Sequence, residues 1–260
     1  MCKVIAIANQ KGGVAKTTSA VSLGVGLVNK ENRVLIIDCD PQGSCTVALG
    51  YQEPDRLEFT LTTIAERILN EEDYGVDEGI LHNEEGVDLL PANIELAGVE
   101  VSLTNQPGSE MFIKEYISEV GSNYDFVIID CSPNLGRLTI SALCAADYVI
   151  VPVQAAFLPV KGLEALLKTI GRVKKRLNPK LEILGILITM VNSQTVFGKE
   201  ITDLINLVYG SHIRIFENQI PRTVRVEECS ADGVSIYKHA GNCSAAKAYE
   251  ALTEEVLEYV

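Results

Sequence analysis

The sequence contains no tryptophan and lacks several features that define specialised classes of protein. No apolar run approaches the roughly 18–20 residues of a transmembrane helix, and no basic start followed by an apolar stretch marks a signal peptide. The seven cysteines are scattered and form no CxxC pair, which argues against a disulfide framework and against zinc or iron–sulfur centres. We therefore expect a reduced, cytoplasmic protein.

Length and composition favour a chain with a sizeable core. The 260 residues correspond to one large domain or two small ones. Apolar residues make up 47% of the chain, enough to build a core and to exclude a disordered protein. No linker rich in proline, glycine or serine and no internal repeat divides the sequence. We therefore expect a single domain over residues 1–260.

The negative charge is concentrated in one region. The formal net charge is −13, and residues 51–125 hold 18 acidic and 3 basic residues, a local balance of −15. The other residues hold 17 acidic and 19 basic residues, a balance of +2. Most of the chain is therefore free to present a basic surface to a polyanion. Within the acidic region we expect an irregular insertion over residues 51–90.

Apolar β-branched runs alternate with stretches of helical periodicity along the whole chain. The runs predict strands at 3–8, 33–38, 126–130, 148–153 and 183–191. The periodic stretches predict helices at 16–30, 94–105, 109–121, 135–146, 161–177, 196–209 and 243–258. Near-continuous Val, Ile and Leu are typical of strands buried on both faces. The expected fold is a doubly wound, mostly parallel α/β sheet with helices on both faces.

A glycine-rich turn with two lysines follows the first predicted strand. Residues 9–18 read NQKGGVAKTT and lead directly into a helix, which is the context of a phosphate-binding loop. Lys16 is placed to reach the β- and γ-phosphates, and the Thr17 hydroxyl to ligate Mg²⁺. The strict pattern GxxxxGK[ST] fails, because Gln10 and Ala15 occupy its glycine positions. A chance Gly-Gly turn with surface lysines is the less favoured alternative.

Three aspartates end two of the predicted strands. Asp130 closes an apolar strand, where an isolated carboxylate is costly unless it meets a cation. A direct or water-mediated contact with Mg²⁺ would offset that cost, and the alternative is an ordinary aspartate that caps the next turn. Asp38 and Asp40 lie two residues apart and so project to the same side of their strand.

Four ordered motifs resemble those of the ParA/Soj family of partition ATPases, within the ParA/MinD superfamily of deviant Walker A proteins. They are the loop at 9–18, VLIIDCDPQGS at 34–44, YDFVIIDCSP at 124–133 and QIPRTVR at 219–225. The resemblance implies a P-loop NTPase that binds ATP and Mg²⁺ and hydrolyses ATP weakly. It also implies a homodimer that sandwiches two ATP molecules, with Lys11 of each subunit reaching the phosphates held by the other.

The resemblance also assigns roles to individual residues. Catalysis would involve Lys11, Lys16 and Asp40, where Asp40 orients the attacking water and Asp38 has either a supporting or a purely structural role. The metal would be held by Thr17 and Asp130. Nucleotide contacts in the loop would come from Gly12, Gly13, Val14, Ala15, Lys16, Thr17 and Thr18. Asn192 and Pro221 are candidate adenine contacts, although an asparagine in a turn is nearly as good an interpretation of Asn192. Ala15 replaces the usual glycine, and we expect it to adopt a negative φ.

Several basic residues are candidates for binding nonspecific DNA. The predicted helix at 161–177 carries an apolar face and, opposite it, a basic face. The basic face consists of Lys161, Lys168, Arg172, Lys175 and Arg176. Such a face usually contacts only solvent, but relatives in this family bind DNA through basic residues on their surface. Arg222 and Arg225 are further candidates, whereas Gln194 stands where relatives commonly carry an arginine.

Other branches of the superfamily fit less well. The C-terminal stretch is acidic and would be repelled by anionic lipid, so we expect no membrane binding. Cys131 is better explained as a small buried residue than as an iron–sulfur ligand. The chain begins at its first strand, so we expect no preceding helix-turn-helix.

Two functions from different classes remain open, with a third less favoured. The first is a partition ATPase that binds DNA as an ATP dimer and works with a ParB-like centromere-binding partner. The second is a ParA-like positioning or regulatory ATPase whose output is protein binding. A metabolic enzyme on the same nucleotide-binding scaffold is the third and weaker option.

Overall fold

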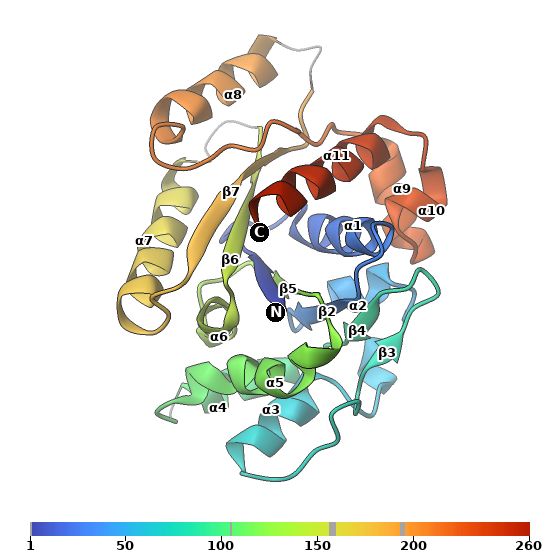
Figure 1. Cartoon of the computed structure of the whole chain (residues 1–260), viewed down its shortest axis with the longest axis vertical. Coiled ribbons are helices and arrows are strands. Elements are labelled where there is room, and N and C mark those ends of the chain that lie inside the picture. The colour runs from blue at the N-terminus through green and yellow to red at the C-terminus, as the bar shows by residue number, and fades with distance from the viewer. Residues whose placement is uncertain (1, 105, 156–159, 193–195) are drawn as a thin grey trace.

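A computed structural model describes residues 2–104, 106–155, 160–192 and 196–260 (Figure 1). In these residues seven strands form one sheet in the order β3-β4-β2-β5-β1-β6-β7. The strands are β1 (Lys3–Ile7), β2 (Val34–Cys39), β3 (Leu81–His82), β4 (Asp88–Leu90), β5 (Phe126–Cys131), β6 (Tyr148–Gln154) and β7 (Glu182–Thr189). Neighbouring strands pair in parallel except β3 and β4, which are antiparallel. The predicted doubly wound, mostly parallel sheet is confirmed.

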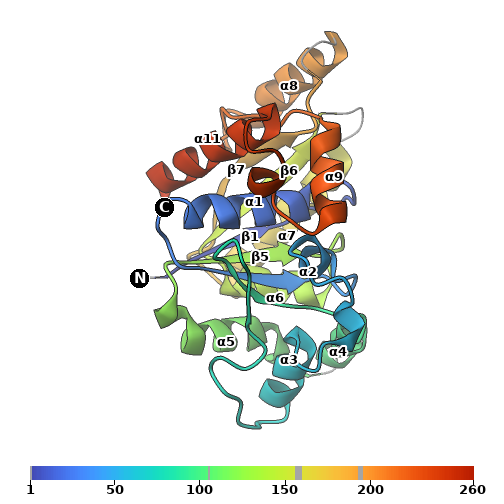
Figure 2. The same cartoon turned by 90° about the vertical axis from the view of Figure 1, so that its right-hand side faces the viewer.

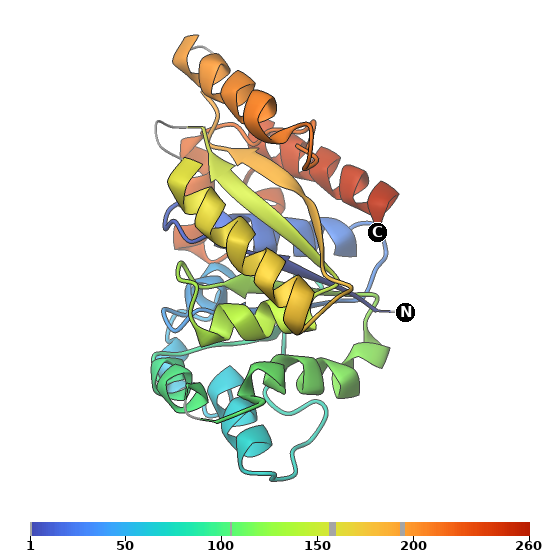
Figure 3. The same ribbon diagram turned by 90° about the vertical axis from the view of Figure 1, so that its left-hand side faces the viewer.

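Helices cover both faces of the sheet (Figures 1 and 2). One face carries α1 (Lys16–Val28), α2 (Ser44–Ala48), α9 (Val224–Asp232), α10 (Ile236–Ala240) and α11 (Ser244–Tyr259). The other carries α3 (Leu61–Leu69), α4 (Leu96–Leu103), α5 (Phe112–Val120), α6 (Arg137–Ala145), α7 (Val160–Arg176) and α8 (Val196–Tyr209). Short 3₁₀ turns occur at η1 (Pro54–Arg56), η2 (Ser109–Met111) and η3 (Gly121–Asn123). Figure 3 shows α7 lying across β6 and β7.

The central strands are buried on both sides, as their apolar runs predict. Every residue of β2 and of β5 is buried. Alternate side chains point to opposite faces, so Ile36 and Ile128 join the core under α1 and α11, while Ile37 and Ile129 join the core on the other face. Two apolar cores therefore hold the sheet rigidly between the two layers of helices.

The order of the strands reverses at β1. The chain leaves β1 for β2 on one side of the sheet, and β6 later pairs with the other side of β1. The helix that follows β1, α1, and the helix that follows β5, α6, cover opposite faces. Such a reversal opens a crevice at the carboxyl ends of the strands, where α/β proteins bind ligands. The glycine-rich turn leaves β1 at this point.

The acidic segment is more regular than predicted. Residues 51–90 contain α3 and both strands of the β3–β4 hairpin, and β4 pairs in parallel with β2. The prediction of an irregular insertion is therefore wrong for these elements. The strands of the hairpin have only two and three residues, too few to show a periodicity. Pairing of β4 with β2, a tertiary contact, forms them. The five predicted strands and seven predicted helices are confirmed to within a few residues.

Candidate nucleotide site

A tight loop connects β1 to α1 and leaves the start of α1 without a capping side chain. Gly13 has a left-handed φ of 67°, and the N-cap residue of α1, Ala15, makes no capping hydrogen bond. The Asn9 side chain orders the entry to the loop by donating to the Pro152 carbonyl at 2.6 Å and accepting from the Lys11 N–H at 3.0 Å. Uncapped N–H groups and the positive end of the helix dipole attract an anion such as phosphate.

Ala15 does not adopt the negative φ that we predicted. Its φ of 64° and ψ of 34° place it in the left-handed region, so the prediction is wrong. An L-residue with a Cβ pays roughly 1–2 kcal/mol for this conformation. The turn requires it because the chain must pass from Gly13 directly into the first turn of α1, and a glycine would adopt it without strain.

Lys16, Thr17 and Asp130 come together although 113 residues separate the last two. The Thr17 hydroxyl donates to Asp130 Oδ2 at 2.7 Å, and the Lys16 ammonium donates to the Lys11 carbonyl at 3.2 Å. Lys16 is only 7% exposed and Asp130 only 1%. The two residues predicted to hold the metal are thus in direct contact, beside the lysine predicted to hold phosphate.

The buried charges at this edge of the sheet are incompletely compensated. Asp38 and Asp130 are register partners on β2 and β5. Burial, aided by the nearby Asp38, raises the pKa of Asp130 well above its usual range, while the Thr17 hydrogen bond and Lys16 oppose this. Burial also raises the pKa of Asp38 to about 6 and lowers that of Lys16. Asp130 Oδ1 is buried without a hydrogen-bond partner in the described part of the chain. A divalent cation would satisfy it, so the residues present fit Mg²⁺.

Asp40 follows β2 on a loop that Asp38 anchors. Asp38 Oδ1 accepts from the Asp40 N–H at 3.2 Å, and Asp40 Oδ1 accepts from the Gln42 N–H at 3.0 Å. Asp38 is fully buried, whereas Asp40 is half-buried and reaches the surface of the edge. Of the two carboxylates, Asp40 is the one that a water molecule at this edge could approach.

Lys11 lies exposed at the front of the loop. Its backbone carbonyl receives the Lys16 ammonium, while no partner for its own ammonium exists among the residues that the structure describes. The side chain is therefore available to a second molecule. Its predicted action on a partner's phosphates stays a prediction.

A pocket of about 270 Å³ opens beside the loop. It is lined by Gly13, Ala15, Gln154, Met190, Ile220, Pro221, Arg222, Thr223, Val226, Glu227 and Tyr249. The strand end that borders it is fixed by a bond of 3.1 Å from the Thr189 hydroxyl to the Val14 carbonyl. Its position and partly apolar lining suit a nucleoside attached to the phosphates.

The two predicted adenine contacts differ in their positions. Pro221 lines the pocket, whereas Asn192 is exposed and does not line it. The sequence analysis missed Gln154, Met190 and Tyr249. No local motif marks these residues. Gln154 ends β6, Met190 follows β7, and Tyr249 lies on α11, whose sequence pattern indicates only packing. Only the contact of α11 with α1, which includes the Ser19–Tyr249 hydroxyl pair at 3.1 Å, brings Tyr249 here.

The predicted DNA residues fall into three groups. Lys168, Arg172, Lys175 and Arg176 are exposed along α7, and no ion pair of theirs occurs in the described chain. Arg222 is exposed and lines the nucleotide pocket, and Arg225 is paired with Glu228 at 2.9 Å. Gln194 and the Lys161 side chain lie outside the part that is described.

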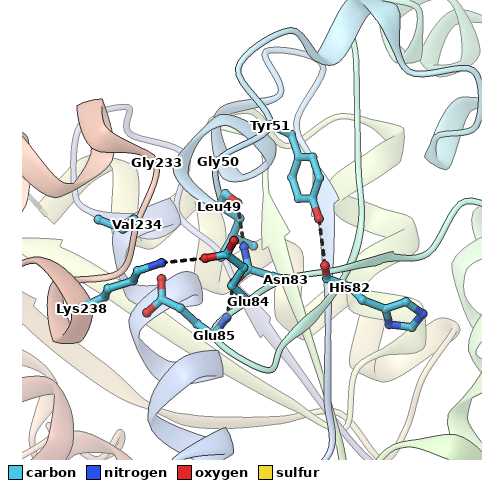
Figure 4. A pocket seen from close by; sticks show the side chains of 10 residues that line it. All are labelled: Leu49, Gly50, Tyr51, His82, Asn83, Glu84, Glu85, Gly233, Val234 and Lys238. Atoms are coloured by element: carbon cyan, nitrogen blue, oxygen red, sulfur yellow. Dashed lines mark hydrogen bonds and ion pairs between the residues drawn. The ribbon is translucent and has the colours of Figure 1, made fainter.

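A second, larger pocket of about 390 Å³ lies between the β3–β4 hairpin and the end of α9 (Figure 4). Lys238 pairs with Glu84 at 3.0 Å, the Tyr51 hydroxyl donates to the His82 carbonyl at 3.2 Å, and Asn83 donates to the Leu49 carbonyl at 2.7 Å. Its polar groups therefore already have partners within the chain.

All seven cysteines are unpaired, and no helix in the described ranges is long and apolar enough to cross a membrane.

Comparison with known proteins agrees with this geometry. Residues 2–183 match a family model described as an AAA domain. The chain is 37% identical to the chromosome partitioning protein ParA of Caulobacter vibrioides, over 98% of this chain and 94% of that one. It is 38% identical to the sporulation initiation inhibitor protein Soj of Bacillus subtilis, over 98% of both chains.

A solved structure shows the same fold. It is named cobyrinic acid a,c-diamide synthase of Mycobacterium smegmatis, with bound ATP analog and magnesium, and it is 35% identical with a TM-score of 0.86, over 99% of this chain and 95% of that one. The fold, the motifs and the near-complete coverage of the ParA and Soj relatives lead to one conclusion: the chain belongs to the ParA/Soj family of partition ATPases.

Proposed function

We propose that the protein is an ATPase that uses ATP and Mg²⁺ to switch between a monomer and a dimer. The observation that carries this is the contact of the Thr17 hydroxyl with Asp130, beside buried Lys16 and under the uncapped start of α1. A similar protein binds an ATP analog with magnesium, and the relative from Caulobacter vibrioides is named a chromosome partitioning protein. The process would be partitioning of a plasmid or chromosome with a ParB-like partner.

The residues of the site divide the work of phosphoryl transfer. Lys16 and the N–H groups of residues 12–18 would hold the phosphates, and Thr17 with Asp130 would hold Mg²⁺, directly or through water. When bound, Mg²⁺ supplies positive charge that stabilises the phosphate oxygens. Asp40 would orient the attacking water, because it is half-buried whereas Asp38 and Asp130 at this edge are fully buried. Pro221 and its neighbours in the pocket would enclose the nucleoside.

Lys11 makes dimerisation part of the mechanism. The residue is exposed at the start of the loop, whereas Lys16 and Asp130 of the same site are buried. In a face-to-face pair it would approach the phosphates of the other subunit and act as an arginine finger does in trans. Weak turnover in the monomer follows, because each site lacks one positive charge until the partner arrives.

Size-exclusion chromatography of the Asp40→Ala variant tests the switch. Without the water-orienting carboxylate, ATP should persist and the protein should elute as a dimer with ATP and Mg²⁺ but as a monomer with ADP. The double variant Asp40→Ala with Lys11→Ala is the matched control and should stay monomeric in both nucleotides. A monomeric Asp40→Ala protein that nevertheless binds ATP contradicts the sandwich mechanism.

We further propose that the dimer binds nonspecific DNA through the exposed bases of α7. The phosphate loop lies at the carboxyl ends of the strands. The C-terminal end of α7, which carries Arg172, Lys175 and Arg176, lies at their amino ends. A sandwich formed at the carboxyl edge would therefore leave these bases on its outer surface. Basic side chains in the last turn of a helix are also favoured by the helix dipole. The experiment must therefore distinguish a DNA-binding face from one that only contacts solvent.

Gel shifts with plasmid DNA across a salt series make that separation. The wild type should bind only with ATP, with an affinity that falls steeply as salt rises. The double variant Arg172→Ala with Lys175→Ala should lose about one to two phosphate contacts, so the slope of log affinity against log salt should fall by about one to two. The control double variant, Lys30→Ala with Lys247→Ala, removes equal charge from the opposite face and should behave like the wild type.

A protein-binding output is the second candidate, and one observation favours it. The region 51–125 carries −15, a surface that repels DNA and attracts basic protein segments. In this case the gel shift fails with ATP although the Asp40→Ala protein dimerises. The two proposals therefore give different results in the same pair of experiments.

A further inference from the structure

We propose that Asp38 and Thr46 together pin the loop that carries Asp40, and that this pin positions Asp40 for hydrolysis. The inference rests on the proposed ATPase function and adds two positioning residues to it. The sequence analysis left open whether Asp38 has a supporting or a structural role. The hydrogen bonds around the loop of residues 40–46 decide in favour of positioning.

Asp38 holds both ends of this loop with one carboxylate. At the near end, Oδ1 accepts from the Asp40 N–H at 3.2 Å. At the far end, Oδ2 accepts from the Thr46 N–H at 2.9 Å and from the Thr46 hydroxyl at 2.8 Å. Asp38 and Thr46 are both 0% exposed, so water does not compete for these bonds. The loop is thereby closed across its base.

Thr46 also ties the closed loop to the sheet. While its hydroxyl donates to Asp38, the same oxygen accepts from the Ala92 N–H at 3.1 Å, just beyond the end of β4. One buried oxygen therefore joins α2, β2 and the segment after β4. A hydroxyl that both donates and accepts is required here, and valine has the same shape but offers neither.

A close backbone contact completes the arrangement. Gly43 lies in the left-handed region with φ 61°, and a Cβ at this position would stand 3.0 Å from the Ala92 carbonyl oxygen. The middle of the loop thus packs directly on the same segment that Thr46 bonds. With its ends and its middle held, the loop has little freedom to displace Asp40.

This rigidity matters because of the neighbours of Asp38. Asp38 is the register partner of Asp130 on β5, so the pin fixes Asp40 relative to the pair Thr17–Asp130. Positioning of reacting groups is the main task in phosphoryl transfer, and a misplacement of about 1 Å can cost on the order of 10²-fold in rate. Loss of the pin should lower turnover more than it lowers binding, since the loop at 9–18 is untouched.

The test compares Thr46→Val, which removes the hydroxyl, with Thr46→Ser, which keeps it. We expect Thr46→Val to lower kcat by about 10- to 100-fold while the affinity for a fluorescent ATP analogue stays within about twofold. Thr46→Ser should recover most of kcat. The control is Thr253→Val, because Thr253 is equally buried and its hydroxyl donates to the Tyr249 carbonyl at 2.8 Å, on α11. It should leave kcat unchanged.

Melting temperatures separate positioning from stability. Thr46→Val and Thr253→Val should lose similar stability, and only the former should lose kcat. Equal kcat in wild type and in folded Thr46→Val overturns the pin and leaves the proposed ATPase intact. Loss of kcat in both Thr→Val variants, in step with melting, also overturns it. Absence of hydrolysis in the wild type overturns the proposed function itself, and the pin with it.

Discussion

The two pockets at the ends of α9 differ in a way that volume does not reveal. The pocket in Figure 4 is the larger, at about 390 Å³ against about 270 Å³ beside the phosphate loop. In the larger one, Lys238 pairs with Glu84, and Glu85 accepts from both the N–H and the hydroxyl of Ser235. At the phosphate loop, Asp130 Oδ1 is buried without a partner in the described chain. Unsatisfied buried charge, rather than volume, identifies the site that needs a ligand.

Backbone strain divides the two pockets in the same way. The left-handed positions at the larger pocket are Gly50 and Gly233, which adopt this conformation without penalty. At the nucleotide pocket they include Ala15 and Met190, with φ of 64° and 54°. Strain of this kind persists where the surrounding structure imposes it, and it gathers at functional sites. The comparison predicts large functional effects at one pocket and small structural effects at the other.

The largest effect is expected for Lys11→Ala. Removing a charge supplied in trans should lower kcat by at least about 10³-fold, the lower end for an arginine finger. The structure of each subunit should be unchanged, because Lys11 is exposed and its backbone bonds remain. Phosphate release by the variant, with circular dichroism as a check on folding, measures this. Near-normal turnover in a folded Lys11→Ala protein would show that each subunit works alone.

Lys16→Gln should follow, with a loss of about 10²–10³-fold in kcat, the usual cost of removing one group that stabilises transition-state charge. Nucleotide affinity should fall as well, because Lys16 is expected to contact the ground-state phosphates. The matched change in the other pocket is Lys238→Gln. It breaks only an exposed ion pair and should alter turnover by less than about twofold. Similar losses in both variants would erase the distinction between the pockets.

Ser235→Ala probes the larger pocket as a structural element. Ser235 caps α10 by accepting from the N–H groups of Tyr237 and Lys238 at 3.2 and 3.3 Å, and it donates to Glu85. Loss of the cap should lower the free energy of unfolding by about 1–2 kcal/mol. ATP hydrolysis should stay near the wild-type rate. Urea unfolding and a phosphate assay on the same preparation give both numbers, and a large loss of turnover would reveal a functional link.

Ala15→Gly should have the smallest effect, and it should raise the free energy of unfolding, whereas most substitutions lower it. Relief of the left-handed conformation contributes roughly 1–2 kcal/mol, and the added freedom of glycine in the unfolded chain takes back about 0.4–1 kcal/mol. The net gain in unfolding free energy should be about 0.5–1 kcal/mol. Gly50→Ala should instead destabilise the protein, because Gly50 of the other pocket has a φ of 96° that a residue with a Cβ rarely adopts. A less stable Ala15→Gly protein would mean that the Ala15 methyl packs favourably enough to outweigh its strain.

Much of the site could be predicted because its residues form local motifs. Lys16 and Thr17 are adjacent, follow a strand and begin a helix, so the turn and its chemistry are visible in ten residues. Asp130 could be placed at the same edge because the carboxyl ends of parallel strands meet there. The conformation of Ala15 could not, since a negative φ satisfies the local sequence and only the exit from Gly13 into α1 forces φ to 64°.

The sequence by itself determined five of the strands, the glycine-rich loop and the residues that we expect to contact phosphate and metal, since each prediction depends on neighbours a few positions away. Tertiary structure alone decided the rest. It formed β4 beside β2, brought Tyr249 to the pocket beside the phosphate loop and tied Thr46 to Ala92. The physical reason is that these contacts join segments dozens to hundreds of residues apart, and a contact of this kind leaves no periodicity or spacing in the chain.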